Sequence, residues 1–301
     1  MMSDVEPQWL RTRQKQSKEA TMEDDRKKER RVFLKSAGAV LVGSAAVTGL
    51  MTETAVARKG KGKGKKRPRW GMVIDIRRCV GCYSCQITCK MENSLPMVGF
   101  GAWVTTMEKG SFPEAKRPFL PHLCNHCEGT ETVGRMLVPP CVKACPEYPK
   151  PTREIYITPE GKKIRYSIGA TYKRPDGAIL YNNELCIGCG KCIKACPYGA
   201  RFFNPNVRLT RKDKEGPFGI GKCTFCIHRL DQGLEPACVK SCVGRARIFG
   251  DLSDPESEVS KLIKENKTKV LLPEKNTSPN VYYIDLDDEL AALNEHANPK
   301  I

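Results

Sequence analysis

Hydrophobic residues along this chain occur in short runs separated by polar, glycine-rich and proline-rich segments, so the sequence predicts few and short elements. The runs from Gly71 to Ile76 and from Ala178 to Tyr181 each precede a group of cysteines and predict β-strands. A third strand is predicted from Val281 to Ile284, and an acidic tail follows it. This pattern predicts a fold of the α+β class.

Helices are predicted in two places. Short helices are expected to follow the C-terminal end of each cysteine group. A longer helix is expected to begin at Asp254, which can cap it, with Pro255 as its first residue. One apolar face of that helix would carry Val259, Leu262 and Ile263, and we expect this face to pack on the outside of the rest of the fold.

The N-terminal segment has the pattern of an export signal. Arg30-Arg31 precede an apolar run from Ser36 to Met51, which is rich in Gly, Ala and Ser and shorter than the roughly 20 residues of a membrane span. Ala55-Val56-Ala57 then resemble a cleavage site. We predict a twin-arginine signal at residues 1–57 and a folded protein exported to the periplasm or to the outer face of the cytoplasmic membrane. An uncleaved membrane anchor is the alternative.

All sixteen cysteines fall into four groups of four. The groups are Cys79, Cys82, Cys85, Cys89; Cys124, Cys127, Cys141, Cys145; Cys186, Cys189, Cys192, Cys196; and Cys223, Cys226, Cys238, Cys242. The first and third have the spacing C-x2-C-x2-C-x3-C, which is the ligand pattern of 4Fe–4S clusters. The second and fourth keep the C-x3-C end after longer gaps of thirteen and eleven residues. We therefore predict four clusters arranged as two pairs.

Zinc and disulfides are the alternative chemistries. Pairs of C-x2-C are common in structural zinc sites, but the third cysteine of the first and third groups has no use in a site closed by two such pairs. Exported cysteines often form disulfides, but bridges between cysteines this close along the chain would be strained. His126 and His228 lie beside cluster cysteines, and we expect neither to be a ligand because cysteines fill every position.

The formal net charge is +17, and residues 58–69 consist of Lys, Arg and Gly with one proline, Pro68. Four clusters would contribute about −8, at roughly −2 each, so part of the basic excess balances them and we expect no nucleic-acid partner. The basic run is predicted to be a flexible linker, or else an arm that docks on an acidic partner or an anionic membrane.

The sequence contains no catalytic constellation: no nucleophile with a base, no Gly-rich nucleotide loop and no paired carboxylates in a motif context. We expect an electron-transfer subunit that is not itself catalytic and binds no substrate directly. Metal-binding free energy contributes to folding when the site does not exist in the unfolded chain, so the apoprotein is expected to be largely unfolded.

Several motifs resemble one known family. They are Cys79-Val80-Gly81-Cys82-Tyr83-Ser84-Cys85, Cys124-Asn125-His126-Cys127, Pro139-Pro140-Cys141-Val142-Lys143-Ala144-Cys145-Pro146, Cys186-Ile187-Gly188-Cys189, Cys196-Pro197-Tyr198-Gly199-Ala200-Arg201 and Lys222-Cys223-Thr224-Phe225-Cys226. Over residues 70–255 the chain resembles the four-cluster iron–sulfur subunits of the dimethyl-sulfoxide-reductase superfamily, which includes polysulfide, thiosulfate, tetrathionate and arsenate reductases.

The resemblance implies two ferredoxin-like halves related by a pseudo-twofold axis, with the C-terminal helix and tail at 256–301. It implies these ligand sets: Cys79, Cys82, Cys85 with Cys242; Cys223, Cys226, Cys238 with Cys89; Cys124, Cys127, Cys141 with Cys196; and Cys186, Cys189, Cys192 with Cys145. The implied partners are a large molybdopterin catalytic subunit and an integral-membrane subunit that handles quinone, between which this chain relays electrons in an anaerobic respiratory oxidoreductase.

Two segments depart from the family pattern. Residues 128–137 and 147–168 are insertions, and they leave open which member of the superfamily the chain serves. The alternative function is that of an exported ferredoxin-like subunit in a molybdenum-free membrane redox complex linked to sulfite reduction, because its cysteine pattern would be the same.

Overall fold

The computed structural model describes residues 67–133 and 136–292, all of which belong to one unit spanning 62–301. The predicted export signal at 1–57 and residues 58–66 of the predicted linker lie outside the described residues.

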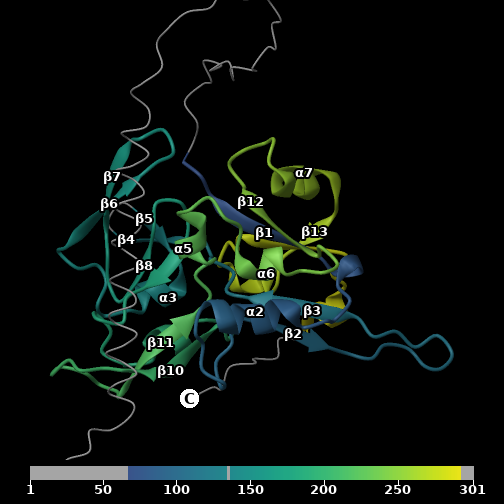
Figure 1. Ribbon diagram of the computed structural model, residues 1–301, viewed down its shortest axis with the longest axis horizontal. Coiled ribbons are helices and arrows are strands. Elements are labelled where there is room, and N and C mark those ends of the chain that lie inside the picture. The colour runs from purple at the N-terminus through teal and green to yellow at the C-terminus, as the bar shows by residue number, and fades with distance from the viewer. Residues whose placement is uncertain (1–66, 134–135, 293–301) are drawn as a thin grey trace, which may run out of the picture. The chain divides into compact units, whose positions relative to one another are not determined.

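A four-stranded sheet runs through the structure in the order β12-β1-β14-β13 (Figure 1). Its strands are β1 (Trp70–Asp75), β12 (Arg247–Asp251), β13 (Thr268–Lys269) and β14 (Val281–Ile284). β1 pairs antiparallel with β12 and parallel with β14, so it is an inner strand, which explains its continuous apolar sequence. The strands predicted at 71–76 and 281–284 are confirmed.

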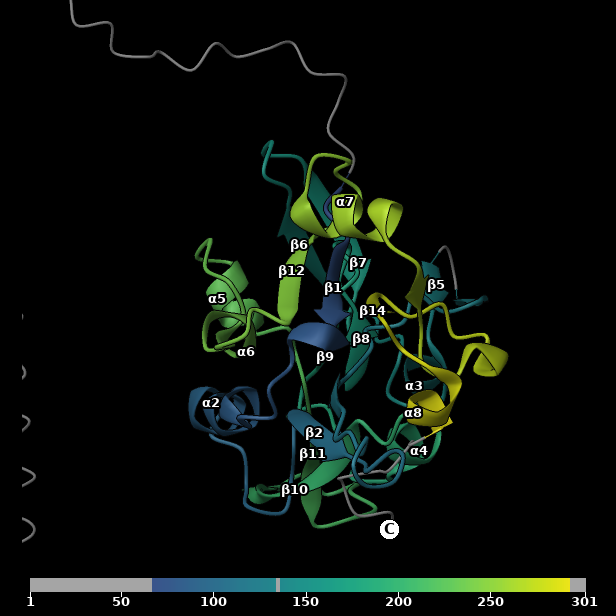
Figure 2. The same ribbon diagram turned by 90° about the vertical axis from the view of Figure 1, so that its right-hand side faces the viewer.

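Helix α7 (Glu258–Glu265) covers one face of this sheet (Figure 2). Its apolar face is confirmed, because Val259 is fully buried and Leu262 and Ile263 pack in the same core. The predicted start at Asp254 is wrong. Ser257 is the N-cap and accepts a hydrogen bond from the Ser260 amide, while Asp254 instead accepts from the amide of Glu256 in the preceding turn.

The helices that carry cysteines differ from the prediction, because they run across the third cysteine of a group and do not follow the fourth. They are α2 (Ser84–Glu92), α3 (Pro140–Lys143), α4 (Lys191–Lys194) and α6 (Ala237–Lys240). The C-x3-C spacing is the i, i+4 spacing that places two side chains on one helix face, as with Cys85 and Cys89 on α2. Other short helices are η2 (Ile76–Arg78), α5 (Ile227–Leu230), η3 (Pro273–Lys275) and α8 (Asp288–Ala292).

Five antiparallel hairpins make up the remaining strands. They are β2 (Ala102–Thr106) with β3 (Phe119–Leu123), β4 (Glu131–Val133) with β5 (Met136–Val138), β6 (Arg153–Ile157) with β7 (Lys163–Ser167), β8 (Thr171–Lys173) with β9 (Ile179–Tyr181), and β10 (Arg201–Arg208) with β11 (Phe218–Lys222). β9 confirms the strand predicted near 178–181. β4–β5 and β6–β7 coincide with the two insertions expected from the sequence.

The cysteines lie among buried apolar residues, which form two main cores. The first is built on Met72, Ile74, Leu120, Phe225 and Tyr283 and includes Cys85, Cys89, Cys124, Cys127 and Cys238. The second is built on Val138, Val142, Ile179 and Ile220 and includes Cys141, Cys145, Cys186 and Cys192. The predicted α+β class is confirmed, and ten of the sixteen cysteines are buried in its interior.

Candidate iron–sulfur cluster sites

One cavity is lined by three cysteines of the first group and one of the fourth: Cys79, Cys82, Cys85 and Cys242. Cys79 follows η2, whose N-cap Asp75 accepts a hydrogen bond from the amide of Arg77. Cys85 lies on α2 and Cys242 follows α6. The packing of these two helices therefore places Cys242 beside the cysteines of the first group.

A second cavity is lined by Cys124, Cys127, Cys141 and Cys196. A third is lined by Cys145, Cys186, Cys189 and Cys192. Each of these two cavities combines three cysteines of one group, the second or the third, with the last cysteine of the other of these two groups. Helix α3 of the second group packs on α4 of the third. The structure therefore brings together three of the four sets that the sequence resemblance implies.

The fourth set is Cys89, Cys223, Cys226 and Cys238. The Nδ2 atom of Asn93 lies 3.8 Å from the Sγ of Cys89 and 3.8 Å from the Sγ of Cys226, which places those two sulfurs around one amide. Burial raises the pKa of Cys89 to about 12, and the neighbouring thiols of Cys238 and Cys226 act in the same direction. Cys223 is likewise subject to the charges of Cys89 and Cys238.

The tight turns between cysteines depend on left-handed backbone positions. Gly81 and Gly188 occupy the same place in the first and third groups, with φ of 65° and 76°. A Cβ atom at Gly188 would lie 2.8 Å from the carbonyl oxygen of Gly216, so only glycine fits this loop without displacement. In the fourth group Phe225 and Cys226 adopt φ of 55° and 51°.

Buried cations lie beside these sulfurs. Arg201 is 1% exposed and donates from Nη2 to the Cys141 Sγ at 3.2 Å, and Arg247 is 2% exposed and lines the first cavity. Burial opposes the charge of each guanidinium, but the surrounding thiolates outweigh it and raise the pKa of both arginines. Lys222 is 2% exposed and donates to the carbonyl oxygens of Ile179, at 2.5 Å, and Cys223.

Comparison with known proteins identifies the family. Residues 115–252 match the family described as "4Fe-4S dicluster domain". The chain is 37% identical over 263 residues to a tetrathionate reductase subunit of Salmonella typhimurium, covering 86% of this chain and 89% of that protein. The chain belongs to the iron–sulfur subunits of the molybdopterin oxidoreductase family. The resemblance found in the sequence is thereby confirmed.

Two further relatives of these iron–sulfur subunits are similar over most of their length. The iron–sulfur subunit of an arsenate respiratory reductase from Shewanella sp. ANA-3 is 37% identical over 255 residues, covering 72% of this chain and 96% of that protein. An Hdr-like menaquinol oxidoreductase iron–sulfur subunit 1 from Archaeoglobus fulgidus is 32% identical over 302 residues, covering 86% of this chain and 99% of the relative.

The donor set suits 4Fe–4S clusters. All sixteen cysteines lie within the described residues and carry free thiols, and thiolates are the ligands such clusters require. The Nε atoms of Arg201 and Arg247 are buried and have no hydrogen-bond partner in the described part of the chain, and the sulfides of a bound cluster can accept from such donors. A bound cluster supplies reversible one-electron transfer.

A tetrahedral zinc site needs sulfurs about 3.8 Å apart, from Zn–S bonds of about 2.3 Å. Among residues 67–133 and 136–292, no three Cys, His, Asp or Glu side chains are grouped to hold a single metal ion. The match to a 4Fe–4S family decides between the two metals. Iron–sulfur chemistry is the better assignment.

The two histidines lie away from ligand positions. His126 is fully buried, accepts a hydrogen bond at Nδ1 from the Ile179 amide and stacks on Phe225 with ring centroids 3.6 Å apart. His228 is exposed and bonds Glu92. Tyr198 and Ile187, which lie beside or inside cysteine groups, are buried, whereas Tyr83 is 39% exposed.

Arg201 and Lys222 belong to the motifs of the family resemblance, but no role was predicted for them or for Arg247 from the sequence. In the sequence these three residues differ from other basic residues only in position. Lys222 directly precedes a cysteine group, and the two arginines each lie five residues beyond the last cysteine of a group. Their burial is visible only in the structure.

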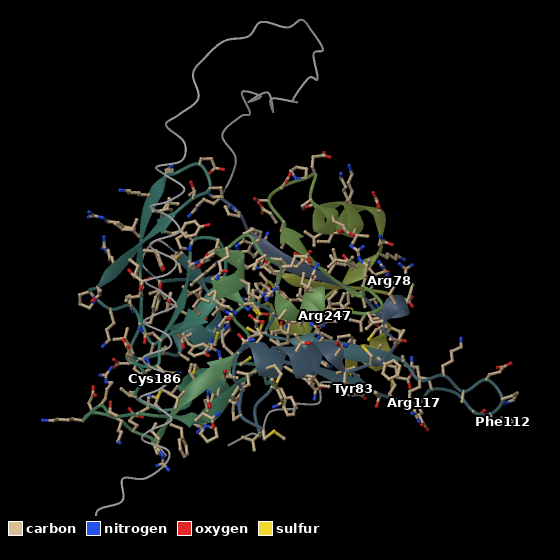
Figure 3. All side chains as sticks on the ribbon, in the orientation of Figure 1. Arg78, Tyr83, Phe112, Arg117, Cys186 and Arg247 are labelled. Carbon is tan, nitrogen blue, oxygen red and sulfur yellow. The ribbon has the colours of Figure 1, made fainter. Side chains whose placement is uncertain are left out.

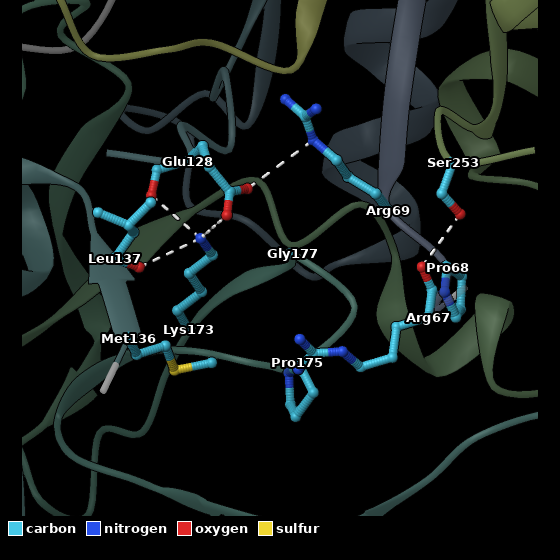
Figure 4. Close-up of a pocket in the computed structure, with 10 residues that line it drawn as sticks. All are labelled: Arg67, Pro68, Arg69, Glu128, Met136, Leu137, Lys173, Pro175, Gly177 and Ser253. Atoms are coloured by element: carbon cyan, nitrogen blue, oxygen red, sulfur yellow. Dashed lines mark hydrogen bonds and ion pairs between the residues drawn. The ribbon is translucent and has the colours of Figure 1, made fainter. Parts of the chain in front are cut away.

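A wider cavity lies apart from the cysteines (Figure 4). None of the ten described residues that line it is a cysteine. Lys173 on its wall is 4% exposed, and its ammonium group is bonded to the carbonyl oxygens of Glu128 and Leu137 and to the Glu128 carboxylate. The lysine therefore joins two segments of backbone and has no donor left for a ligand.

No helix in the described residues is both long and apolar enough to cross a membrane.

Proposed function

We propose that this chain relays electrons through four 4Fe–4S clusters between a membrane subunit that exchanges electrons with quinone and a molybdopterin catalytic subunit. The observation that carries the proposal is the gathering of twelve cysteines into three cavities, each lined by cysteines from two groups of the sequence, together with the Cys89 and Cys226 sulfurs around Asn93. The tetrathionate and arsenate reductase subunits among its relatives support the assignment to a reductase complex.

Three of the proposed ligand sets follow the cysteine-lined cavities, and the set with Cys89 follows the sulfurs around Asn93 and the sequence resemblance. The four proposed sets are Cys79, Cys82, Cys85 and Cys242; Cys89, Cys223, Cys226 and Cys238; Cys124, Cys127, Cys141 and Cys196; and Cys145, Cys186, Cys189 and Cys192. We refer to them as clusters one to four in this order.

Clusters one and two would form one ferredoxin-like half, and clusters three and four the other. Helix α2 of the first group packs on α6 of the fourth, and α3 of the second packs on α4 of the third. Helices α3 and α6 also begin alike, each with a proline N-cap before Cys141 or Cys238. These parallels support a pseudo-twofold relation between the halves.

The clusters would form a single line. Cys85 of cluster one interacts electrostatically with Cys238 of cluster two. Cys223 of cluster two interacts with Cys124 of cluster three, and Cys141 of cluster three with Cys192 of cluster four. Electrons would pass through each cluster in turn, from one end of this line to the other.

We further propose that the protein works in the periplasm, or on the outer face of the membrane, after export in the folded state. The twin arginines Arg30-Arg31 and the apolar run behind them support this. Export of the folded protein suits clusters that are assembled in a reducing cytoplasm.

The test is elemental analysis of the native complex, purified without oxygen through a tag on this chain. About sixteen iron atoms from this subunit, four per cluster, with about one molybdenum or tungsten atom per copy, are expected. Similar iron without either metal would move the assignment to the molybdenum-free complex. Zinc in place of iron would refute the cluster assignment altogether.

A further inference from the structure

Two buried arginines occupy equivalent places in the two parts of the chain. Arg201 is five residues beyond Cys196, Arg247 is five residues beyond Cys242, and each is the first residue of a strand, β10 or β12. Both are almost completely buried, at 1% and 2% exposure. Burying a guanidinium is costly unless a nearby negative charge offsets it, so this repeated placement requires an explanation.

Arg247 lines the cavity of cluster one and begins strand β12, which packs on α6, the helix that carries Cys238 of cluster two. Its charge acts on Cys85 of cluster one and on Cys238 of cluster two. Its Nη2 donates to the carbonyl oxygen of His122 at 3.1 Å, and no described carboxylate forms an ion pair with it. The thiolates are therefore the negative groups that face this cation.

Arg201 has the same relation to clusters three and four. Its Nη2 donates to the Cys141 sulfur of cluster three at 3.2 Å, and its charge also acts on Cys192 of cluster four. The remaining Nη1 donates to the Thr171 hydroxyl at 3.2 Å.

Lys222 is the cation between the two middle clusters. Its ammonium group donates to the carbonyl oxygen of Cys223 of cluster two and to that of Ile179, which lines the cavity of cluster three. These two carbonyl oxygens hold the ammonium group in place. One buried cation therefore lies at each of the three junctions in the line of clusters.

We propose that Arg247, Lys222 and Arg201 set the reduction potentials of the clusters on either side of them, so that each cation raises the potentials of two neighbouring clusters together. Reduction adds one electron to a cluster that already carries roughly −2, and a fixed positive charge stabilises the reduced form more than the oxidised form. Because these side chains are buried, water screens them little. This inference rests on the proposed function, since it requires the four clusters.

The test is a redox titration followed by electron paramagnetic resonance on the purified complex. Signals are first assigned by replacing one cysteine of each set with serine. The variants are Arg201→Gln, Arg247→Gln and Lys222→Gln, with Arg201→Lys to keep the charge. Arg208→Gln on β10 and Arg245→Gln are matched controls, because both arginines are exposed and lose the same charge.

Arg201→Gln should lower the equilibrium constant for one-electron reduction of clusters three and four at least about tenfold. This corresponds to a fall of about 59 mV in their reduction potentials. The potentials of clusters one and two should stay close to wild type. Arg247→Gln should lower the reduction potentials of clusters one and two and leave those of clusters three and four close to wild type. Lys222→Gln should lower the potentials of clusters two and three. Arg201→Lys should stay near wild type. The exposed control variants should shift the reduction potentials by about a quarter as much. The electrostatic effect of a charge is inversely proportional to the effective dielectric constant, which is about 80 in water and about 20 near a protein.

Equal shifts in all four clusters, no shift, or the same shift in Arg201→Lys as in Arg201→Gln would overturn the inference. Loss of iron in Arg201→Gln that Arg201→Lys restores would support a need for the charge, and loss in both would contradict it. Iron is counted in every preparation. A wild-type protein without about sixteen irons defeats the proposed function, whereas full iron with unshifted potentials defeats only this inference.

Discussion

Asp176 lies in the turn between β8 and β9, where it pairs with Arg174 and accepts a hydrogen bond from Trp70 of strand β1, so its loss should weaken the fold. The Arg174 Nη2 lies 2.6 Å from the Asp176 Oδ2, and the two side chains are 11% and 0% exposed. The same oxygen accepts a hydrogen bond from the Trp70 indole at 3.0 Å. Asp176→Ala would leave a largely buried arginine and a half-buried indole without this partner.

Removing one member of a buried ion pair costs about 3–5 kcal/mol. Arg174 keeps Asp231 as a second carboxylate, so the lower end of about 3 kcal/mol applies. Each 1 kcal/mol corresponds to about 2–4 °C for a chain of this size, so the melting temperature should fall by about 6–12 °C.

The assay is thermal unfolding of the cluster-loaded protein, followed by circular dichroism and cluster absorbance at one fixed scan rate, because cluster loss makes unfolding irreversible. The control is Glu108→Ala. Glu108 and Arg117 form a pair that is 73% and 63% exposed, on the loop between β2 and β3 that extends from the fold (Figure 3). Exposed pairs contribute about 0–1 kcal/mol. A fall in Asp176→Ala no larger than in this control would refute the reasoning.

Three further outcomes are expected. His228→Ala and His126→Gln should keep the full iron content, because cysteines fill every ligand position of the proposed clusters; loss of a quarter of the iron in either would make that histidine a ligand. Chelation of the iron should leave the apoprotein largely unfolded by circular dichroism, and a near-native spectrum would contradict the role of the clusters in folding. Structure that persists in the apoprotein should be lost as the pH rises from about 9 towards about 12. Burial raises the pKa of Cys89 and Cys196 from the ordinary 9.0 to about 12, so their neutral forms stabilise the folded state below about pH 9, and ionisation favours the unfolded chain above it; structure that survives at pH 11 would contradict this.

The sequence predicted those features that local pattern determines. The strand β1 is a continuous apolar run, and the spacing of the cysteines is enough to predict that they bind 4Fe–4S clusters. The start of α7 was missed because Asp254, Pro255 and Ser257 are all good helix-start residues, and the bond from the Ser260 amide to Ser257 decides between them. The helices around the cysteines were misplaced because we expected each helix to begin after the C-x3-C segment. In the structure the helix includes the third cysteine, and the C-x3-C spacing corresponds to one helical turn.

Long-range features had no local signal. Arg201 and Arg247 are ordinary charged residues in the sequence, and their burial follows from the approach of cysteine groups that are far apart along the chain. Tyr83 lies inside the first cysteine group, yet its side chain is 39% exposed and its backbone is left-handed, with φ of 57°, and neither property has a local signal in the sequence.

The most direct test of the account is electron paramagnetic resonance of Cys242→Ser beside Cys82→Ser and Cys238→Ser. Cys242 lines the cavity of Cys79, Cys82 and Cys85, although Cys238 is its neighbour in sequence. The account predicts that Cys242→Ser and Cys82→Ser change the same signal and that Cys238→Ser changes a different one. If Cys242→Ser instead changes the signal affected by Cys238→Ser and leaves the Cys82 signal intact, the sharing of ligands between distant groups is wrong.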